Sequence, residues 1–310
     1  MASRFVVLTY HRVLDAPDPL RPGLCHRARF ASQLRVLKRA FNVLDVSEAL
    51  ARLDAGTLPA RSVVITFDDG YRDNFDNAMP MLRAAGLGAC FFVATGFVGD
   101  GVMWNDVVVE TVRRRPPGAW SLEETGLGVR QIDDMASRRR VLRELIVNLK
   151  HRAPAQRDAL TRALADSSAA ASRRLMMRED EVRQMAQAGM TIGAHTVSHP
   201  ILTRLDDPGA REEMAASRRT LENTLQRPVD LFAYPNGKLG DDYDERHAVM
   251  ARECGFRAAF TTQWGYCNAR APRFEMPRVG LEDESGWRFA AKLGRAFFEP
   301  ARQNAPSIAR

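Results

Sequence analysis

The stretch VVITFDDGYRDN, Val63 to Asn74, decides the fold of this chain. Five residues suited to a buried strand lead directly into two adjacent carboxylates, Asp68 and Asp69, and then into Gly70. Like charges repel, and neither carboxylate is stable in an apolar interior. We therefore expect both side chains to leave the strand at its carboxyl end and to share a pocket in which a cation offsets their charge.

Other short apolar runs alternate with segments of helical periodicity on both sides of this strand. Strands are expected at residues 5–10, 63–67, 89–94, 190–194, 229–234 and 256–261, and helices at 30–39, 77–85, 206–226 and 244–254. Apolar strands that alternate with helices are typical of a parallel sheet covered by helices. The sequence therefore predicts an α/β fold, and at this length a (β/α) barrel is the natural closed form.

One segment interrupts the alternation. Residues 105–187 have little strand character and indicate several helices around a loop at 116–128, so we interpret them as a helical insertion that serves as a lid, a partner surface or a packing element. The expected organisation is a barrel domain over 1–285, followed by a C-terminal helix and a loose tail over 286–310. Aromatic and basic residues at helical spacing in 287–298 indicate packing on the barrel or contact with a membrane surface.

Composition restricts the class of protein. The 310 residues are 45% hydrophobic, which is enough for one large core, and the formal charge is +7. Basic residues occur throughout without a basic–aromatic stripe, which indicates a solvated surface rather than a nucleic-acid site, with attraction to an anionic substrate or membrane as the alternative. The four cysteines form no Cys-x-x-Cys pair. With no signal peptide or membrane-spanning stretch recognised, a cytoplasmic protein is expected.

A second polar cluster, GAHTVSHP at 193–200, also follows an expected strand. His195 and His199 are four residues apart, so a tight loop or one helical turn brings both imidazoles to one side. Two histidines and one carboxylate form a facial metal site that leaves positions for water and substrate. One Asp of the pair can then bind the metal while the other takes a proton from a water that the cation acidifies. A purely structural His pair is the alternative.

Two further clusters follow strands. TYHRV, residues 9–13, places His11 directly after the first strand, where it can act as a general acid or, alternatively, make only local hydrogen bonds. LFAYPNG, residues 231–237, ends another strand with a Pro-x-Gly turn. Backbone N–H groups in such a turn can face a developing oxyanion, although the turn is an ordinary one by itself.

Together these clusters resemble the polysaccharide deacetylase superfamily, the metal-dependent carbohydrate esterases of family 4 that share the NodB-homology domain. The resemblance covers residues 9 to about 281 apart from the insertion, and TFDDGY and HTVSHP are its most specific parts. It implies a distorted (β/α) barrel of about seven parallel strands. It also implies that Asp69, His195 and His199 bind a divalent metal and that Asp68 is the catalytic base. Zn²⁺ is the expected ion, with Co²⁺, Ni²⁺ and Mn²⁺ as alternatives.

The chain departs from the common family pattern in two motifs. Phe232 and Ala233 stand where the third motif usually begins with Arg, and MPRVGLED contains no counterpart of the late Leu-x-His motif. The layout is more similar to that of the poly-N-acetylglucosamine de-N-acetylases, in which an early Tyr-His element supplies the acid, as His11 would here. The same resemblance assigns Arg278 to orienting Asp68.

The resemblance also implies contacts with substrate. They are expected from Tyr71, Trp104, Asn105, Tyr234 and Pro235. Trp104 would stack on a sugar ring, although a core tryptophan is the alternative, and the backbone N–H of Tyr234 would stabilise the oxyanion.

The expected reaction is removal of an N-acetyl group from an amino sugar with release of acetate. Two alternatives stay open: a glycan-binding barrel without turnover, and a deacylase that acts on an O-acetyl ester or a cyclic amide. The substrate is expected to be a nucleotide- or lipid-linked sugar intermediate. Nucleic acid is not an expected partner, while peripheral membrane contact remains an option.

Overall fold

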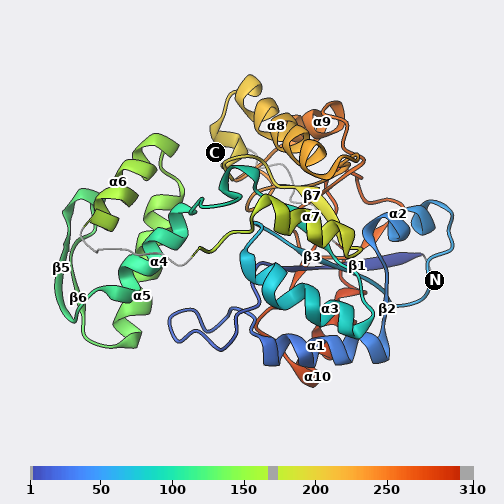
Figure 1. Ribbon diagram of the computed structural model, residues 1–310, viewed down its shortest axis with the longest axis horizontal. Coiled ribbons are helices and arrows are strands. Elements are labelled where there is room, and N and C mark those ends of the chain that lie inside the picture. The colour runs from blue at the N-terminus through green and yellow to red at the C-terminus, as the bar shows by residue number, and fades with distance from the viewer. Residues whose placement is uncertain (1–2, 167–173, 301–310) are drawn as a thin grey trace. The chain divides into compact units, whose positions relative to one another are not determined.

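The computed structural model describes residues 3–166 and 174–300 (Figure 1). The chain divides into two compact units. The first unit consists of Met1–Ala16, Gly23–Gly99 and Met176–Arg310, and the second of Pro17–Pro22 and Asp100–Leu175. The segment 179–187, which the sequence analysis assigned to the insertion, therefore belongs to the first unit. The loose tail expected at 301–310 lies outside the described residues.

The first unit is built on a curled, mostly parallel sheet. Its parallel strands pair in the order β1 (Arg4–Tyr10), β3 (Ser62–Phe67), β4 (Cys90–Val93), β7 (Thr191–Ala194), β8 (Leu231–Ala233) and β9 (Ala258–Phe260). The segment 276–280 contacts both edges, because Met276 bridges Phe260 in β9 and β11 (Val279–Gly280) pairs with β1. β2 (Asn42–Val43) extends the sheet beside β3, and β10 (Cys267–Asn268) pairs antiparallel with the start of β1. The α/β class and the distorted barrel expected from the sequence are thus confirmed.

The strands are continuous apolar runs because side chains alternate between two faces of the sheet and both faces are buried. Every residue of β3 is buried. One face contributes Val63, Ile65 and similar residues to a core shared with the helices, and the other contributes Val64 to a second core. Because successive side chains point to opposite faces, Thr66 and Asp68 lie on the same face of the strand as Val64. This alternation aims Asp68 into the barrel.

Helices cover the outside of the sheet. They are α1 (Arg27–Ala40), the π-helical turn η1 (Asn74–Ala78) running into α3 (Met79–Ala85), α7 (Glu179–Gln187), α8 (Asp207–Leu225), α9 (Glu245–Glu253) and α10 (Gly286–Ala296), with single turns η2 (Thr95–Phe97) and η4 (Leu202–Arg204). The buried residues of α2 (Val46–Asp54) pack instead in the second core, which contains Val64. Asp206 caps α8 by accepting from the Gly209 N–H at 2.9 Å. α10 packs beside α1 (Figure 1) and buries Phe289 and Leu293 completely, whereas Trp287 at its start is 75% exposed.

The second unit has its own hydrophobic core. It contains α4 (Trp104–Arg114), β5 (Gly118–Leu122), η3 (Glu123–Thr125), β6 (Gly128–Ile132), α5 (Met135–Lys150) and α6 (Pro154–Asp166). The expectation of a purely helical insertion is wrong at β5 and β6, which form an antiparallel hairpin. Gly126 and Gly128 adopt positive φ in the connection, and Trp120 and Leu122 point into the core on alternate positions. This alternation is too short to stand out in a segment dominated by helical composition.

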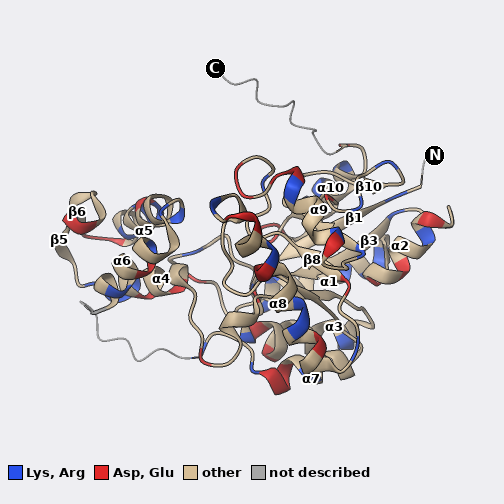
Figure 2. Cartoon of the chain, turned by 90° about the horizontal axis from the view of Figure 1, so that it is seen from above, with Lys and Arg blue, Asp and Glu red and all other residues tan. Residues whose placement is uncertain are grey.

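The remaining features are the distribution of charged residues over the helices and the apolar length of each helix. Lys and Arg lie among Asp and Glu over the helices of the first unit in Figure 2, and α8 carries both signs. Within the described residues, we find no helix that combines the length and apolar character needed to cross a bilayer.

Candidate active site

The predicted polar clusters lie at the carboxyl ends of neighbouring parallel strands. Asp68 and Asp69 follow β3, His11 follows β1, and His195 follows β7. The backbone is unusual here, because Asp69, Thr196 and His199 adopt left-handed φ angles of 76°, 64° and 52°. Non-glycine residues in this region cost free energy and are held there by surrounding structure, often at functional sites.

Asp69, His195 and His199 converge. The Nε2 atoms of His195 and His199 lie 3.5 and 3.4 Å from Asp69 Oδ1. Asp69 Oδ1 is buried and accepts no hydrogen bond from the described residues. One ligand atom from each side chain lies within 4.8 Å of the others, so the three can hold a metal ion. The buried oxygen with no donor is the observation that fits a cation best.

Neighbouring groups hold the two histidines in a form that can bind a metal ion. His195 Nδ1 lies 2.7 Å from the carbonyl oxygen of Ala233, so it carries the proton and leaves a lone pair on Nε2. The backbone N–H of His199 donates to Thr196 Oγ1 at 3.1 Å, which shapes the loop between the two imidazoles. Burial lowers the pKa of His199 to about 4, so its ring is neutral at pH 7, as a metal ligand must be.

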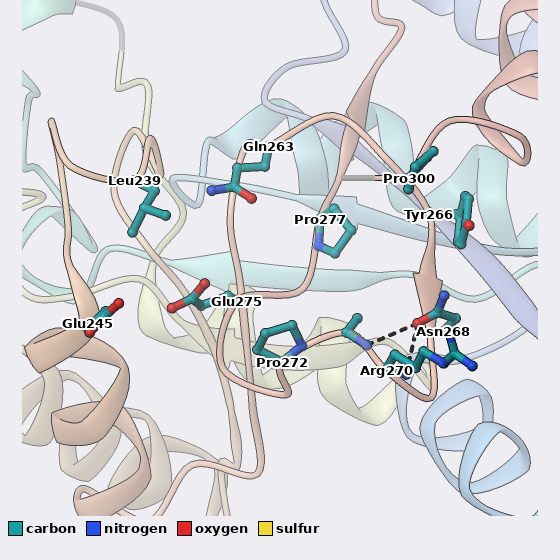
Figure 3. A pocket seen from close by; sticks show the side chains of 11 residues that line it. Leu239, Glu245, Gln263, Tyr266, Asn268, Arg270, Pro272, Glu275, Pro277 and Pro300 are labelled. Atoms are coloured by element: carbon teal, nitrogen blue, oxygen red, sulfur yellow. Dashed lines mark hydrogen bonds between the residues drawn. The ribbon is translucent and has the colours of Figure 1, made fainter. Parts of the chain in front are cut away.

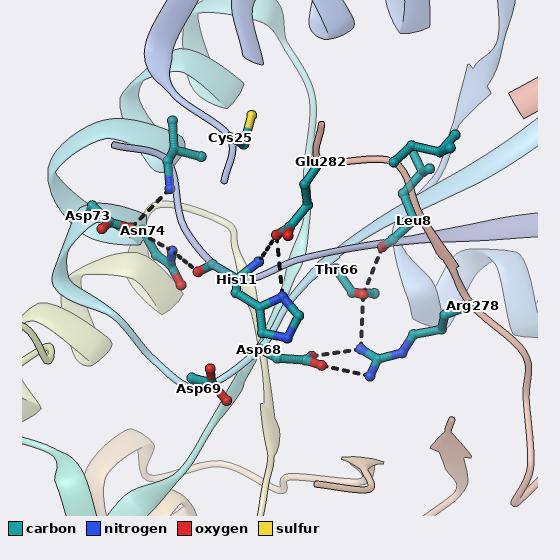
Figure 4. Close-up of polar contacts among 12 residues, drawn as sticks. Leu8, His11, Cys25, Thr66, Asp68, Asp69, Asp73, Asn74, Arg278 and Glu282 are labelled. Atoms are coloured by element: carbon teal, nitrogen blue, oxygen red, sulfur yellow. Dashed lines mark hydrogen bonds and ion pairs between the residues drawn. The ribbon is translucent and has the colours of Figure 1, made fainter. Parts of the chain in front are cut away.

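Asp68 has a different partner. Arg278 donates from both terminal nitrogens to its two carboxylate oxygens, at 2.6 and 2.7 Å (Figure 4). Arg278 is only 1% exposed and is itself positioned by the carbonyl of Thr261, which accepts from Nε at 2.9 Å. Burial raises the pKa of Asp68, but the Arg278 guanidinium opposes it and the net pKa is lowered. Asp68 is therefore an oriented, ionised carboxylate.

His11 is paired with a residue that the sequence analysis missed, Glu282. One oxygen of Glu282 accepts from the His11 backbone N–H and lies 3.3 Å from its Nδ1 (Figure 4). Burial lowers the pKa of His11, but Glu282 outweighs burial and raises it to about 10. Because the side chain is 43% exposed, solvent weakens this attraction while its direction holds. The available signal was the late segment MPRVGLED, which has an acid close to where the family pattern places a histidine.

The expected oxyanion role of Tyr234 is wrong. Its backbone N–H donates to the carbonyl of Phe260 at 3.0 Å, within the pairing of β8 and β9, and its hydroxyl donates to Phe274 at 3.0 Å. Tyr234 and Pro235 are both buried. The N–H of Asn236, in the turn after β8, has no hydrogen-bond acceptor in the part of the chain that the structure describes.

Three other predicted contact residues lie in different surroundings. Tyr71 is 2% exposed, and its ring lies 4.4 Å from the Arg12 guanidinium carbon, so it offers a substrate little surface. Trp104 and Asn105 begin α4 in the second unit, where Trp104 packs against the core of that unit with Arg157 over its ring at 5.2 Å. Their contact with substrate stays a prediction.

The first unit therefore presents an ionised carboxylate, an imidazole held by a carboxylate, and three residues that can hold a metal ion, all at one end of its barrel. A base, an acid and a Lewis acid together are the groups that hydrolysis of an acyl bond requires.

Comparison with known proteins identifies the family of this chain. A family model described as "Polysaccharide deacetylase" matches residues 55–259. The Bacillus subtilis protein YxkH, whose name assigns it to the polysaccharide deacetylases, is 21% identical over 294 residues, or 94% of this chain and 76% of that protein. The poly-β-1,6-N-acetyl-D-glucosamine N-deacetylase of Staphylococcus aureus is 31% identical over 108 residues, which cover 31% of this chain and 37% of that protein.

Solved structures share the fold. The Streptococcus pyogenes deacetylase PplD, whose structure is a complex with acetate, superposes with a TM-score of 0.64 at 18% identity. The match covers 94% of this chain and 99% of PplD.

Proposed function

We propose that this chain, which belongs to the polysaccharide deacetylase family, removes N-acetyl groups from an amino-sugar glycan by metal-dependent hydrolysis. The observation that carries the proposal is the convergence of Asp69, His195 and His199 beside an Asp68 that Arg278 holds. The partial match to an N-deacetylase of poly-N-acetylglucosamine supports an N-acetyl substrate.

A divalent ion held by Asp69, His195 and His199 would polarise the amide carbonyl and lower the pKa of water. Two imidazoles and one carboxylate suit Zn²⁺, and the same donors also bind Co²⁺, Ni²⁺ and Mn²⁺. The contact of His195 Nδ1 with the Ala233 carbonyl leaves Nε2 of His195 to bind the metal. The buried Oδ1 of Asp69 lies close to Nε2 of both imidazole rings.

Asp68 acts as the general base. Arg278 occupies one lone pair on each carboxylate oxygen and keeps the group ionised, so a second lone pair stays available to a water proton. The water oxygen then forms its bond to the acetyl carbon. The N–H of Asn236, which has no acceptor among the described residues, is one candidate donor to the oxyanion.

His11 acts as the general acid. Glu282 favours its imidazolium form and holds Nδ1, which leaves Nε2 to protonate the departing nitrogen. The carbon–nitrogen bond breaks, and the products are acetate and a free amine. The absence of a histidine in the late motif is the reason to consider a glycan-binding barrel without turnover. The His11–Glu282 pair supports turnover instead, because it offers an acid from the first strand. The cytoplasmic location and a nucleotide- or lipid-linked substrate remain proposals from the sequence alone.

Acetate release from N-acetylglucosamine oligomers by purified, zinc-loaded protein tests the function, with O-acetylated oligomers as the alternative substrate. Asp69→Asn is expected to lose both bound zinc, measured by elemental analysis, and acetate release. Asp76→Asn is the matched control, because Asp76 is half-exposed and pairs only with Arg72 among the ion pairs of the described residues. Full zinc content and activity in Asp69→Asn would overturn the proposal, and release from O-acetylated oligomers alone would reassign the bond.

A further inference from the structure

The loop that joins the two histidines of the candidate metal site is held from outside by a carboxylate that the proposed mechanism does not use. We refer to residues 195–199 as the ligand loop. One oxygen of Glu213, in α8, accepts from the backbone N–H of Val197 at 2.8 Å and from that of Ser198 at 2.9 Å. Its other oxygen accepts from the Ser198 hydroxyl at 2.6 Å. One side chain therefore makes three hydrogen bonds to two successive residues of the ligand loop.

This contact has the form of an anion-binding turn. Successive backbone N–H groups beside a residue in the left-handed region form a concave site for a negative group, and Thr196, with φ of 64°, directly precedes Val197. Glu213 is partly buried. The preceding residue, Glu212, has a side chain that is 66% exposed and pairs with Arg219 at 2.7 Å. Two adjacent carboxylates of α8 therefore have different partners, and the partner of Glu213 is the ligand loop.

The ligand loop requires support because its backbone is strained. Thr196 and His199 both adopt left-handed φ angles, which are unfavourable for non-glycine residues and persist where the surrounding structure imposes them. On the side of η2, the backbone N–H of Gly96 donates to the carbonyl oxygen of Val197 at 2.9 Å. A Cβ on Gly96 would lie 2.7 Å from this oxygen, so the approach is close. Both polar backbone groups of Val197 are thus engaged, the carbonyl by η2 and the N–H by Glu213.

Of the two histidines, His199 depends more on the ligand loop for its position. The Nδ1 atom of His195 lies 2.7 Å from the carbonyl oxygen of Ala233, so a neighbouring strand orients that ring. Within the part of the chain that the structure describes, no hydrogen bond orients the His199 ring, whose Nε2 lies 3.4 Å from Asp69 Oδ1. The side chain of His199 is also 20% exposed, against 2% for His195. The backbone of the ligand loop therefore sets the approach of His199 to an ion.

We propose that Glu213 is a positioning residue for the metal site. By holding the backbone N–H groups of Val197 and Ser198, it keeps the ligand loop in the conformation from which His199 reaches the ion. The inference rests on the proposed function, because it concerns the same metal site, and it adds a residue outside the three ligands on which metal affinity depends. Groups that orient metal ligands commonly contribute about 10- to 100-fold to metal affinity.

Zinc affinity tests this inference without turnover. It is measured on the purified full chain at neutral pH by competition with a chromophoric chelator. Glu213→Ala is expected to raise the zinc Kd about 10- to 100-fold. Glu213→Gln is expected to keep the Kd within about 3-fold of that of the unmodified protein, because its amide oxygen can accept from both N–H groups and its NH₂ group can donate to the Ser198 hydroxyl. Rescue by Gln separates the hydrogen bonds of Glu213 from its charge.

Two other carboxylates of the first unit are matched controls. Glu212→Ala removes the exposed neighbour of Glu213 on the same helix. Glu275→Ala removes a carboxylate that is partly buried, like that of Glu213, but that lines a separate cavity of about 400 Å³ together with Gln263 (Figure 3). Among the described residues, neither control side chain is hydrogen-bonded to the ligand loop, so the zinc Kd is expected to stay unchanged in both variants.

Ser198→Ala is a second test that keeps the Glu213 side chain. It removes one of the three hydrogen bonds at an exposed position. The zinc Kd is expected to rise about 2- to 10-fold, the size of one hydrogen bond. Denaturant titration with a chelator present checks that each variant is folded without metal.

An unchanged zinc Kd in folded Glu213→Ala would overturn the inference. So would an equal rise in Glu213→Ala and Glu213→Gln, which would assign the effect to charge, or a comparable rise in either control. If Glu213→Ala does not fold, an unchanged Kd in Ser198→Ala decides against the inference. In each of these outcomes the unmodified protein still binds zinc and releases acetate, whereas the proposed function fails if the unmodified protein releases no acetate from any oligomer.

Discussion

Replacing Glu282 with Gln tests the identity of the general acid. The substitution keeps an oxygen that can accept from the His11 backbone N–H, but it removes the negative charge 3.3 Å from Nδ1. His11 can donate a proton only while it is protonated. Activity is therefore present below the folded-state pKa of His11 and is lost as the pH rises through this pKa. If the pKa of His11 falls, the alkaline limb of the pH profile must move to lower pH.

The size of the shift follows from the distance. Two unit charges 3.3 Å apart interact with about 1.3 kcal/mol at the dielectric constant of water and about 5 kcal/mol at an effective value of 20. At 1.36 kcal/mol per pKa unit, removing the charge lowers the His11 pKa by about 1 to 4 units. The 43% exposure of the side chain favours the lower half of this range. A metal at Asp69 also opposes protonation of His11, so the starting pKa in the loaded enzyme lies below about 10.

The assay is kcat/KM for acetate release between pH 6 and 11 at constant ionic strength. Glu282→Gln is expected to move the alkaline limb down by the amount above and to lower activity at pH 8. Glu284→Gln is the matched control, because Glu284 lies in the same segment but pairs with Lys292. If the limb stays in place in Glu282→Gln, or moves equally in both variants, His11 is not the acid that this geometry assigns.

Three further outcomes are expected. Arg278→Lys should lower kcat about 10- to 100-fold, and it should move the acidic limb up, because Asp68 loses the guanidinium that lowers its pKa and must be ionised to act. Chelation should abolish acetate release and lower the thermal midpoint, since an ion at 100 times its Kd stabilises the folded state by about 2.7 kcal/mol. Gly193→Ala should destabilise by about 1–3 kcal/mol in denaturant titration, since its Cβ would lie 2.5 Å from the ring of Phe92, whereas Gly88→Ala, with nothing within 4 Å, should not.

The sequence predicted the parts of the site that local pattern determines. Asp68 and Asp69 directly follow a strand that is apolar on both faces, and His195 and His199 follow another. In a parallel sheet the carboxyl ends of strands share one edge, so the convergence of these clusters could be expected before any coordinates existed.

Contacts between residues that are far apart in the chain could not be predicted from the sequence. Glu282 is separated from His11 by 271 residues, and although the late segment MPRVGLED offers an acid, its sequence does not show that this acid meets His11. The error at Tyr234 has a related cause. Its N–H belongs to the pairing of β8 with β9, and the extent of such a ladder depends on where the neighbouring strand ends. A turn motif alone does not specify which of its N–H groups stays available.

The two adjacent aspartates end in different environments because the backbone changes direction between them. Asp68 completes the inward alternation of β3 and reaches Arg278, whereas Asp69, with φ of 76°, leaves the strand and meets the histidines. Gly70 continues the turn with φ of 89°, and a Cβ there would lie 3.0 Å from Val93. A general base must not bind the metal, because it has to accept a proton, whereas a ligand must stay bound to the metal. The strained turn therefore gives two identical side chains, one residue apart, the separate surroundings that the proposed base and ligand require.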